Sequence, residues 1–425
     1  MRTAQFSLIP TIFLGVLLAG CNAKPESTAN SSLVYWRTLT GSAGEAQDEL
    51  VRRFNSTQDI CEVTSEFQGS YSDLATKLLT SAAAKTGPNV TQLGTFEIRE
   101  FAKAGLLVNL TPFLQGTLPL DTSAWPASLA EAGVVDGNVY WLPFNVAVPV
   151  LYYNQDAFTE AGVNQPPGTW KEFYEAARKL TRRDPNGRVS RAGIALWNIT
   201  WPLVSMIWSE GGELTNRDYT NVTLNDPIAI QILSELQQLA REGCLTMPDK
   251  ASGGHRAAFI SGRSAMILDS QDAFGEVYDR AAGFTPALAQ YPAGAKGKVY
   301  APGGGGLAMI STAREDQREA AWSFIRYMLA PESIAYYSGA SGYVAFTPEA
   351  RELMGERLQD PRFQTIHDAL QYVRADFSVN MSPPVRDAFD RAFHKILLED
   401  ADVKQTLDAA DAEAEAVLAA SMRNE

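Results

Sequence analysis

Histidine and cysteine are scarce in this chain of 425 residues, which contains three of each. The histidines, His255, His367 and His394, lie far apart in the sequence, and no two cysteines have the close spacing of a metal-binding pair. A structural zinc site draws several ligands from these two residue types. The sequence therefore gives little support to a metal site, and we expect no metal ion and no other cofactor.

Positive charge is also in short supply. Lys and Arg total 36 against 49 Asp and Glu, which gives a formal net charge of -13. Binding to nucleic acid requires a concentrated basic surface, and so does binding to an anionic lipid surface. We therefore expect no nucleic acid partner, and no direct contact between the folded body and a membrane.

Long apolar runs are absent apart from one near the N-terminus. Arg2 is followed by the apolar stretch from Phe6 to Leu18 and then by Ala-Gly-Cys ending at Cys21. This pattern resembles a bacterial lipoprotein signal over residues 1–20, with Cys21 as the future lipid anchor. The alternatives are an ordinary signal peptide with a chance cysteine, or a membrane anchor. The stretch is short for a bilayer span, and Pro10 interrupts it.

The segment that follows Cys21 is rich in Ser, Asn, Ala and Pro. Residues 21–32 are therefore expected to form a flexible tether. Together the two segments predict an exported protein that is lipid-anchored at the cell envelope, either in the periplasm or on the outer face of the cytoplasmic membrane.

From residue 33 onward, short apolar segments alternate with amphipathic ones. The periodicity predicts strands at 33–36, 62–67 and 89–93, helices at 45–54, 72–84 and 96–104, and a long extended stretch at 140–153. This order is typical of an α/β fold with a mainly parallel sheet covered by helices. At about 150 residues per domain, the length indicates two or three compact units.

Several helix starts carry capping residues. Thr169 and Glu172 fit a capping box, and Asp226 followed by Pro227 fits an N-cap with proline at the first helical position. Thr312 to Glu315 is expected to open a third helix. The tail from about Pro383 to Met422 is expected to be helical and solvated at its Ala/Glu/Asp-rich end.

A run of glycines from Gly303 to Gly306 matches the dinucleotide-binding fingerprint only loosely. That fingerprint requires a helix directly after the glycines, whereas Leu307 to Ile310 has the pattern of a strand. Two interpretations remain open. The bare backbone either allows a ligand or hinge to approach closely, or makes a simple tight connection.

No short motif marks a catalytic centre. The chain lacks the Gly-x-Ser-x-Gly nucleophile elbow, and nothing singles out an acid and base pair among its 49 acidic residues. His255 follows two glycines and is interpreted as a loop histidine rather than a base. We therefore do not expect an enzyme, and a secreted glycoside hydrolase remains the alternative from another class, with a lipid-anchored adhesion or assembly protein as a third.

Aromatic residues gather near the ends of the expected strands, where open α/β sheets place their ligands. A flat ring covers the apolar face of a sugar while neighbouring polar groups bind its hydroxyls. Some of these aromatics will belong to the core instead. The set comprises Trp36, Tyr71, Phe96, Trp141, Trp197, Trp201 and Tyr343.

Two stretches carry a family resemblance. The sequence YYNQDAF at 152–158 and the sequence PPGTWKEF at 166–173 are followed in order by FISGRSAM at 259–266. AGLLVNL at 104–110 and the segment 322–332 also fall in the same order. The chain resembles the extracellular solute-binding proteins, family 1, of carbohydrate ABC importers. The match extends over nearly the whole chain after the signal.

Within that family the chain is similar to two kinds of member, the binders of glycerol-3-phosphate and glycerophosphodiesters, and the maltose-binding proteins. Val146 and Ala147 stand where the glycerol-phosphate binders have serines, and Thr95 stands at their acidic ligand residue. Their C-terminal arginine falls near Ser378, with Arg374 close enough to substitute. The loss of hydroxyl and guanidinium donors weakens phosphate recognition, which favours a neutral sugar.

The resemblance implies a two-lobed periplasmic-binding-protein fold of type II, with two discontinuous lobes joined by a hinge. Lobe 1 would comprise 33–144 and 300–342, and lobe 2 would comprise 145–299 and 343–425. Because Cys61 and Cys244 would then lie in different lobes, we favour two free buried thiols over a disulfide.

The implied function is capture of a sugar or small oligosaccharide between the lobes and its delivery, unaltered, to an ABC permease. Glycerol-3-phosphate or glycerophosphodiesters are the alternative ligands, and we expect a monomer. The residues expected to bind the ligand come from both lobes and from the hinge: Tyr71, Phe96, Glu97, Asn145, Trp197, Asn198, Trp201, Asp269, Ser270, Gly304, Gly305 and Tyr343.

Overall fold

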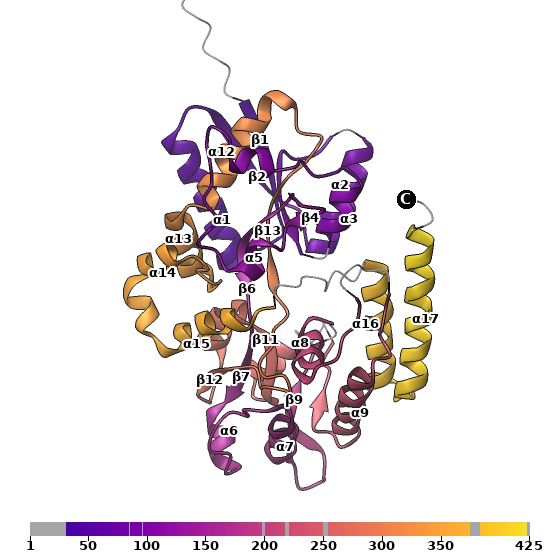
Figure 1. The fold of residues 1–425 in the computed structure, drawn as a ribbon. Helices are drawn as coiled ribbons and strands as arrows, with labels where there is room; N and C mark the ends of the chain where they lie inside the picture. Colours follow the sequence, from indigo (N-terminus) through magenta and orange to yellow (C-terminus); the bar gives the residue numbers. More distant parts are fainter. Residues whose placement is uncertain are drawn as a thin grey trace, which may run out of the picture.

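The computed structural model describes residues 31–84, 86–95, 97–197, 200–216, 221–249, 254–374 and 383–422. The expected signal, tether and Cys21 anchor lie outside this set, except that Ser31 and Ser32 begin the first strand. The described chain forms two α/β lobes, one above the other in Figure 1, joined by extended segments. None of the helices within it has the length and apolar character that a bilayer crossing requires.

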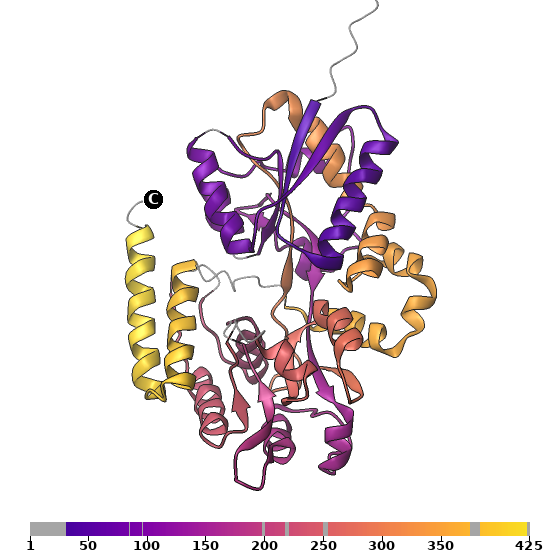
Figure 2. The ribbon, with the colours of Figure 1, turned by 180° about the vertical axis from the view of Figure 1, so that it is seen from behind.

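The first lobe is built on a sheet of order β2-β1-β3-β13-β6. Its strands are β1 (Ser31–Arg37), β2 (Cys61–Phe67), β3 (Val90–Gly94), β6 (Leu142–Ala147) and β13 (Gly303–Met309). Helices α1 (Gly41–Thr57), α2 (Tyr71–Ala83), α3 (Ile98–Lys103), α12 (Arg318–Met328) and α13 (Pro331–Ser341) surround it (Figure 2). The short elements α4 (Thr111–Leu114), α5 (Ala127–Ala130), β4 (Val134–Val135) and β5 (Asn138–Val139) complete the lobe.

The second lobe is built on a sheet of order β10-β9-β11-β7-β12, with β8 paired to β9. Its strands are β7 (Pro149–Asn154), β8 (Arg182–Arg183), β9 (Val189–Ala195), β10 (Leu245–Thr246), β11 (Ser264–Ser270) and β12 (Pro286–Gln290). Its helices in chain order are α6 (Gln155–Glu160), α7 (Trp170–Leu180), α8 (Thr200–Glu210), α9 (Pro227–Arg241), α10 (Gly254–Ile260) and α11 (Phe274–Arg280).

The later helices follow the last strand. These are α14 (Pro348–Leu353), α15 (Pro361–Ala369), α16 (Pro383–Leu398) and α17 (Val403–Met422). The short 3-10 helices are η2 (Gln271–Ala273), which precedes β12, and η3 (Glu315–Gln317), η4 (Gly355–Gln359) and η5 (Leu370–Tyr372), which follow β13. Helix α15 packs on β12 and α16 packs on α9, so this part of the chain belongs mainly with the second sheet.

The expected strands and helices are present, but the sheets are mixed rather than mainly parallel. Strands β2, β1 and β3 run parallel, as do β10, β9 and β11, whereas β13, β7 and β12 run antiparallel to their neighbours. The antiparallel strands lie next to the connections between the lobes. A chain that leaves one sheet to enter the other reverses its direction relative to the βαβ units.

Two of the three expected caps form. Thr169 and Glu172 make a complete capping box at the start of α7, and the Asp226 side chain accepts from the Ile228 N–H at the start of α9. The Thr312 prediction is wrong. The hydroxyl of Thr312 has no hydrogen-bond partner in the part of the chain that the structure describes, and the helix α12 begins later, after the turn η3.

The tail is helical, as the sequence predicts. It forms two helices, α16 and α17, which pack side by side (Figures 1 and 2). The break falls at Asp400, whose φ of 57 places it in the left-handed region. There the carboxylate of Asp400 accepts from the Arg241 guanidinium at 2.6 Å. Ion pairing to α9 thus fixes a turn that helical periodicity alone does not reveal.

Cys61 and Cys244 are both free and buried. Cys61 begins β2 of the first sheet, and Cys244 lies just before β10 of the second. Burial raises the pKa of the Cys61 thiol to about 11, so this thiol stays protonated at neutral pH.

Candidate functional site

The two sheets face each other with the carboxyl ends of their parallel strands. Strand β6 ends at Ala147 beside the glycines of β13, and β7 begins at Pro149 opposite Ser270, the last residue of β11. Only Val148 separates the two strands. Because open α/β sheets bind ligands beyond the carboxyl ends of their strands, this arrangement directs both binding edges into one space between the lobes.

A buried chain of hydrogen bonds forms the lobe 1 side of this space. The Asn145 side-chain amide lies 2.9 Å from the Tyr71 hydroxyl and 2.8 Å from the Gln92 amide nitrogen, and in the orientation that satisfies both of its polar atoms its oxygen accepts from the Tyr71 hydroxyl. Gln92 in turn accepts from the backbone N–H of Thr38 at 2.9 Å. Burial raises the pKa of Tyr71 to about 12, so its hydroxyl remains a neutral donor.

The glycine run is required by this packing. A Cβ on Gly304 would lie 1.8 Å from the Asn145 carbonyl oxygen, and a Cβ on Gly305 would lie 2.6 Å from the Tyr71 hydroxyl. Gly304 also has a φ of +94, which side chains other than glycine rarely adopt. The glycines therefore allow neighbouring protein groups, the Asn145 backbone and the Tyr71 side chain, to pack closely against β13.

Glu97 lies in the loop after β3 and is 3% exposed. One of its carboxylate oxygens, Oε2, has no hydrogen-bond partner among the described residues. Burial raises the pKa of Glu97, while the charge of Arg386 opposes that shift. A buried carboxylate oxygen without a donor is costly, so Glu97 has unused acceptor capacity.

Arg386 reaches Glu97 from the other lobe. Its guanidinium lies 3.9 Å from the Glu97 Oε1 atom, and it belongs to α16, which packs on α8 and α9 of lobe 2. This ion pair therefore spans the space between the lobes.

Trp197 and His255 form the lobe 2 side. Trp197 follows β9, and its indole stacks on the His255 imidazole with centroids 5.0 Å apart and planes 16° apart. The indole Nε1 atom is buried and has no hydrogen-bond partner among the described residues. It is therefore an available donor next to a partly exposed aromatic face.

Asp269 lies next to the stacked pair of Trp197 and His255, which we call the aromatic wall. It is 0% exposed, and its carboxylate accepts from His255 at 2.8 Å and from Arg256 at 2.6 Å. Burial alone would raise the pKa of Asp269, but Arg256 and His255 outweigh it and hold the pKa well below its usual range. Because its oxygens are occupied and enclosed, Asp269 is placed to support the wall rather than to contact a ligand. Ser270 caps the following turn, where its hydroxyl accepts from the Asp272 N–H.

Trp201 is anchored to the crossing segment. Its indole N–H donates to the Pro302 carbonyl at 2.9 Å, and a Cβ on Gly303 would lie 2.7 Å from its ring. Trp201 is therefore packed between α8 and the start of β13, with 6% of its surface exposed.

A cavity of about 590 Å³ opens between the lobes at one end of this region. Lobe 1 contributes residues 38–43 and the end of α13, while lobe 2 contributes Arg256, Asp272 and Glu276. Tyr343 of the crossing lines the cavity and stacks on Tyr337 at 5.6 Å. The Arg256 guanidinium is neutralised here, since it also donates to Asp272 at 2.8 Å and lies 3.8 Å from Glu276.

The structure thus brings together much of the expected set around one interlobe space, although Asp269 is enclosed and Trp201 is tied to the crossing. Phe96, Asn198 and Ser378 lie outside the described residues. Arg374, weighed above as a substitute cation, pairs with Glu213 at 2.8 Å and lies over Trp208 instead.

Four residues of the site were missed: Gln92, Arg256, Asp272 and Arg386. His255 was noticed but interpreted as a loop histidine, whereas it lies in the first turn of α10 and is 5% exposed. The adjacent basic pair His255-Arg256 was the available signal. Its acidic partner is on a later strand, which sequence spacing does not identify.

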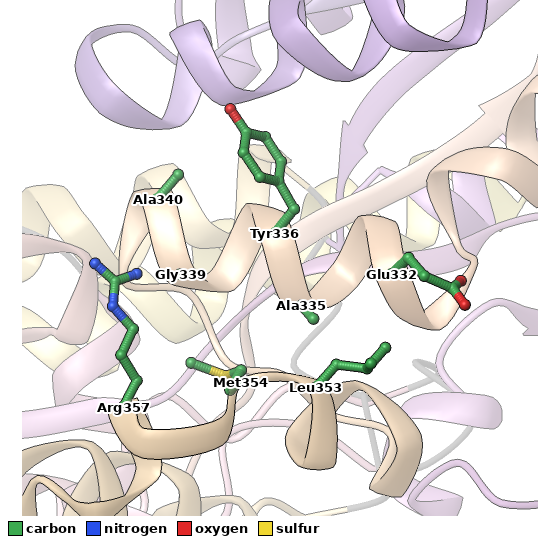
Figure 3. A pocket seen from close by; sticks show the side chains of 8 residues that line it. All are labelled: Glu332, Ala335, Tyr336, Gly339, Ala340, Leu353, Met354 and Arg357. Atoms are coloured by element: carbon green, nitrogen blue, oxygen red, sulfur yellow. The ribbon is translucent and has the colours of Figure 1, made fainter. Parts of the chain in front are cut away.

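A second concavity, of about 490 Å³, lies outside the interlobe space between α13 and the segment from α14 to η4. In Figure 3, Ala335 faces Leu353 and Met354 across it, and Arg357 reaches toward Gly339. Within the described chain, no group of His, Cys, Asp or Glu side chains is arranged to hold a metal ion.

Comparison with known proteins decides the family. The model of the bacterial extracellular solute-binding proteins matches residues 39–335, which is more than half of the chain. The chain belongs to this family. The expected resemblance is thereby confirmed, together with the two-lobed fold.

Relatives and solved structures agree with this solute-binding protein assignment. The sn-glycerol-3-phosphate-binding periplasmic protein UgpB of Rhizobium meliloti is 25% identical over 94% of this chain and 96% of its own length. UgpB from Mycobacterium tuberculosis in complex with glycerophosphocholine superposes with a TM-score of 0.83 at 24% identity, over 92% of this chain and 100% of that one. The ABC substrate-binding protein Lmo0181 from Listeria monocytogenes, in complex with cycloalternan, gives 0.79 at 22% identity, over 92% and 99%.

Proposed function

We propose that this solute-binding protein captures a neutral polyhydroxylated solute, a sugar or small oligosaccharide, between its lobes and delivers it unaltered to an ABC permease. It would be exported and held at the cell envelope through a lipid on Cys21. The lobes, 33–144 with 300–342 and 145–299 with 343–425, are proposed to close on the solute because the closed form binds it more tightly.

The proposal of a neutral ligand rests on the charges of the interlobe region. Arg256, a cation of the cavity wall, is compensated by three carboxylates, those of Asp269, Asp272 and Glu276. Glu97 adds a buried carboxylate with an open oxygen. Hydroxyl groups donate well to such an oxygen, whereas a phosphate would be repelled by it.

The aromatic side of the region supports the same ligand class. The Trp197 indole follows the carboxyl end of β9, stacks on His255, and carries an N–H without an acceptor among the described residues. A sugar presents both an apolar face and hydroxyls to such a group. No bond needs to be made or broken, and we propose that the protein is not an enzyme.

A second candidate is a glycerol-3-phosphate or glycerophosphodiester ligand. It is favoured by the similarity to the UgpB proteins and by the Arg386 guanidinium, which enters the interlobe region. In this case Arg386 would bind the phosphate and Glu97 would bind the glycerol hydroxyls.

A thermal-shift screen separates the two. The purified protein would be tested with maltose, trehalose, sucrose, glycerol-3-phosphate and glycerophosphocholine. A ligand at about 100 times its dissociation constant adds about 2.7 kcal/mol to the stability. We expect one or more of the sugars to raise the melting temperature, with no products after prolonged incubation. A response to the phosphates alone would favour the second candidate, and turnover of labelled oligosaccharides would favour a hydrolase.

A further inference from the structure

The Trp197 indole differs from most of the other tryptophans of the protein in how it is held. Five other tryptophans donate their indole N–H to a protein oxygen: Trp36, Trp141, Trp170, Trp201 and Trp322. The Trp197 N–H has no such partner among the described residues, although the Nε1 atom is buried. Its side chain is therefore oriented by contacts to its ring faces and edges.

One face of that ring is covered by His255. The two rings are close to parallel, with planes 16° apart and centroids 5.0 Å apart. In the described part of the chain, His255 is the ring that stacks on Trp197. A parallel contact of this kind fixes the plane of the indole and still leaves its opposite face free of an aromatic neighbour.

His255 is itself held firmly. The residue is 5% exposed, and its Nε2 atom lies 2.8 Å from the Asp269 carboxylate on β11. Asp269 is fixed in turn by Arg256 and by the backbone N–H of Ser270 at 2.7 Å. The position of the imidazole is thus set by the sheet of lobe 2 through a buried carboxylate.

We propose that His255 is a positioning residue for ligand binding, which transmits the rigidity of β11 through Asp269 to the indole of Trp197. Trp197 then presents one face and its N–H to the solute in a single orientation. Preorganisation of this kind improves affinity because less side-chain freedom is lost on binding. The inference rests on the proposed function, since it assigns a support to the aromatic wall of that site.

A double-mutant cycle tests the coupling. The variants are Trp197→Ala, His255→Ala and the double variant, with His255→Phe to restore a flat ring. Affinities for maltose, trehalose and glycerophosphocholine would be measured by titration calorimetry. We expect about tenfold weaker binding for Trp197→Ala and about fivefold for His255→Ala, whereas His255→Phe, which keeps a flat ring but loses the hydrogen bond to Asp269, should show an intermediate loss of about twofold to threefold.

The double variant decides the role. If His255 acts through Trp197, the double variant binds no more weakly than Trp197→Ala alone. A further fivefold loss in the Trp197→Ala background would show that His255 acts independently, and would overturn the proposal. Should His255→Ala fail to fold, His255→Gln keeps a hydrogen bond to Asp269 without the ring, and the same outcomes apply to it.

A measurement without ligand completes the test. In protein labelled with 5-fluorotryptophan, the Trp197 fluorine resonance is assigned by its loss in Trp197→Phe. We expect one sharp resonance in the wild type, a broadened or divided one in His255→Ala, and an intermediate width in His255→Phe, which keeps the ring without the hydrogen bond to Asp269. An equally sharp single resonance in His255→Ala would overturn the proposal.

The same measurements can refute the proposed role of Trp197 and the positioning role of His255 separately. Unchanged affinity of Trp197→Ala for every probe that binds would remove the aromatic wall from the proposed function. A loss in Trp197→Ala without any loss in His255→Ala or His255→Gln would refute the positioning role alone.

Discussion

The Arg386 guanidinium of α16 lies 3.9 Å from the Glu97 carboxylate, so a charge of lobe 2 meets a buried charge of lobe 1. Glu97 is 3% exposed and keeps one oxygen without a partner among the described residues. At this distance the pair does not satisfy the carboxylate fully. The Glu97 carboxylate thus keeps one acceptor oxygen unpaired among the described residues, beside the contact between the lobes.

Glu97→Gln is expected to weaken sugar binding while it stabilises the folded protein. The loss of a charged acceptor costs about tenfold in affinity. Burial raises the pKa of Glu97 above its ordinary value of 4.5, so its contribution to stability declines as the pH rises through that window. The variant should therefore have the larger free energy of unfolding at neutral pH, measured by urea denaturation beside calorimetric titration.

The matched control for this pair of effects is Glu131→Gln, at an exposed glutamate after α5. It should change neither quantity. Glycerol-3-phosphate adds a further check, because removal of the Glu97 charge should not weaken the binding of an anionic ligand. A Glu97→Gln variant that is less stable and binds sugars normally would contradict the assigned role.

The buried side chain of His367 should make the free energy of unfolding fall in acid. Its Nδ1–H donates to the Phe363 carbonyl and its Nε2 accepts from the Ala345 N–H at 3.2 Å, and burial lowers its pKa to about 4. The unfolded chain binds a proton near pH 6.5 and the folded one only near 4, so stability is lost as the pH falls through this interval. The loss amounts to about 3 kcal/mol.

Urea denaturation between pH 7.5 and pH 4 measures this slope. His367→Gln should flatten it, whereas His394→Gln, at an exposed histidine of α16, should leave it unchanged. Identical slopes in the wild type and in His367→Gln would show that other groups govern the acid response.

Gly305→Ala is expected to damage both stability and binding. The added Cβ would lie 2.6 Å from the Tyr71 hydroxyl and 2.8 Å from the Leu93 carbonyl, and Tyr71 is part of the site. Overpacking of this kind costs about 1–3 kcal/mol. Thermal denaturation and titration should both show a loss, whereas Gly275→Ala in α11, whose added Cβ meets nothing within 4 Å, should leave the thermal stability unchanged or slightly higher.

Asp272→Asn probes the charge selectivity of the cleft. Asp272 compensates Arg256 at 2.8 Å, so the variant leaves more positive charge in the cavity. We expect glycerol-3-phosphate to bind about fivefold more tightly, with sugar affinity changed by less than about twofold. Asp279→Asn, at an exposed position of α11, is the control. An unchanged affinity for glycerol-3-phosphate would mean that Arg256 does not influence the preference of the cleft for neutral over anionic ligands.

Local patterns predicted the elements of this fold well where their causes are local. The Thr169–Glu172 capping box and the apolar face of α1 depend on residues close in sequence, and both are present. The tail turn at Asp400 depends on Arg241, and the late start of α12 leaves Thr312 without a partner. These features depend on contacts between distant segments, which periodicity does not reveal.

The site divides in the same way. Tyr71 was identifiable because it lies near a strand end and Asn145 because it belongs to a family-like segment at the crossing, and the structure joins them by a hydrogen bond of 2.9 Å. Asp269 was assigned to the ligand because carboxylates bind hydroxyls, but His255 and Arg256 occupy it. Whether a polar side chain faces the cleft or another side chain is decided by tertiary packing.

Closure of the two lobes around a neutral solute is the central step of the proposed function. Small-angle X-ray scattering of the protein, titrated with the sugar that gives the largest thermal shift, tests this directly. We predict that the radius of gyration falls along the same saturation curve as calorimetric binding. A radius of gyration that stays constant while the sugar saturates the protein would contradict the account.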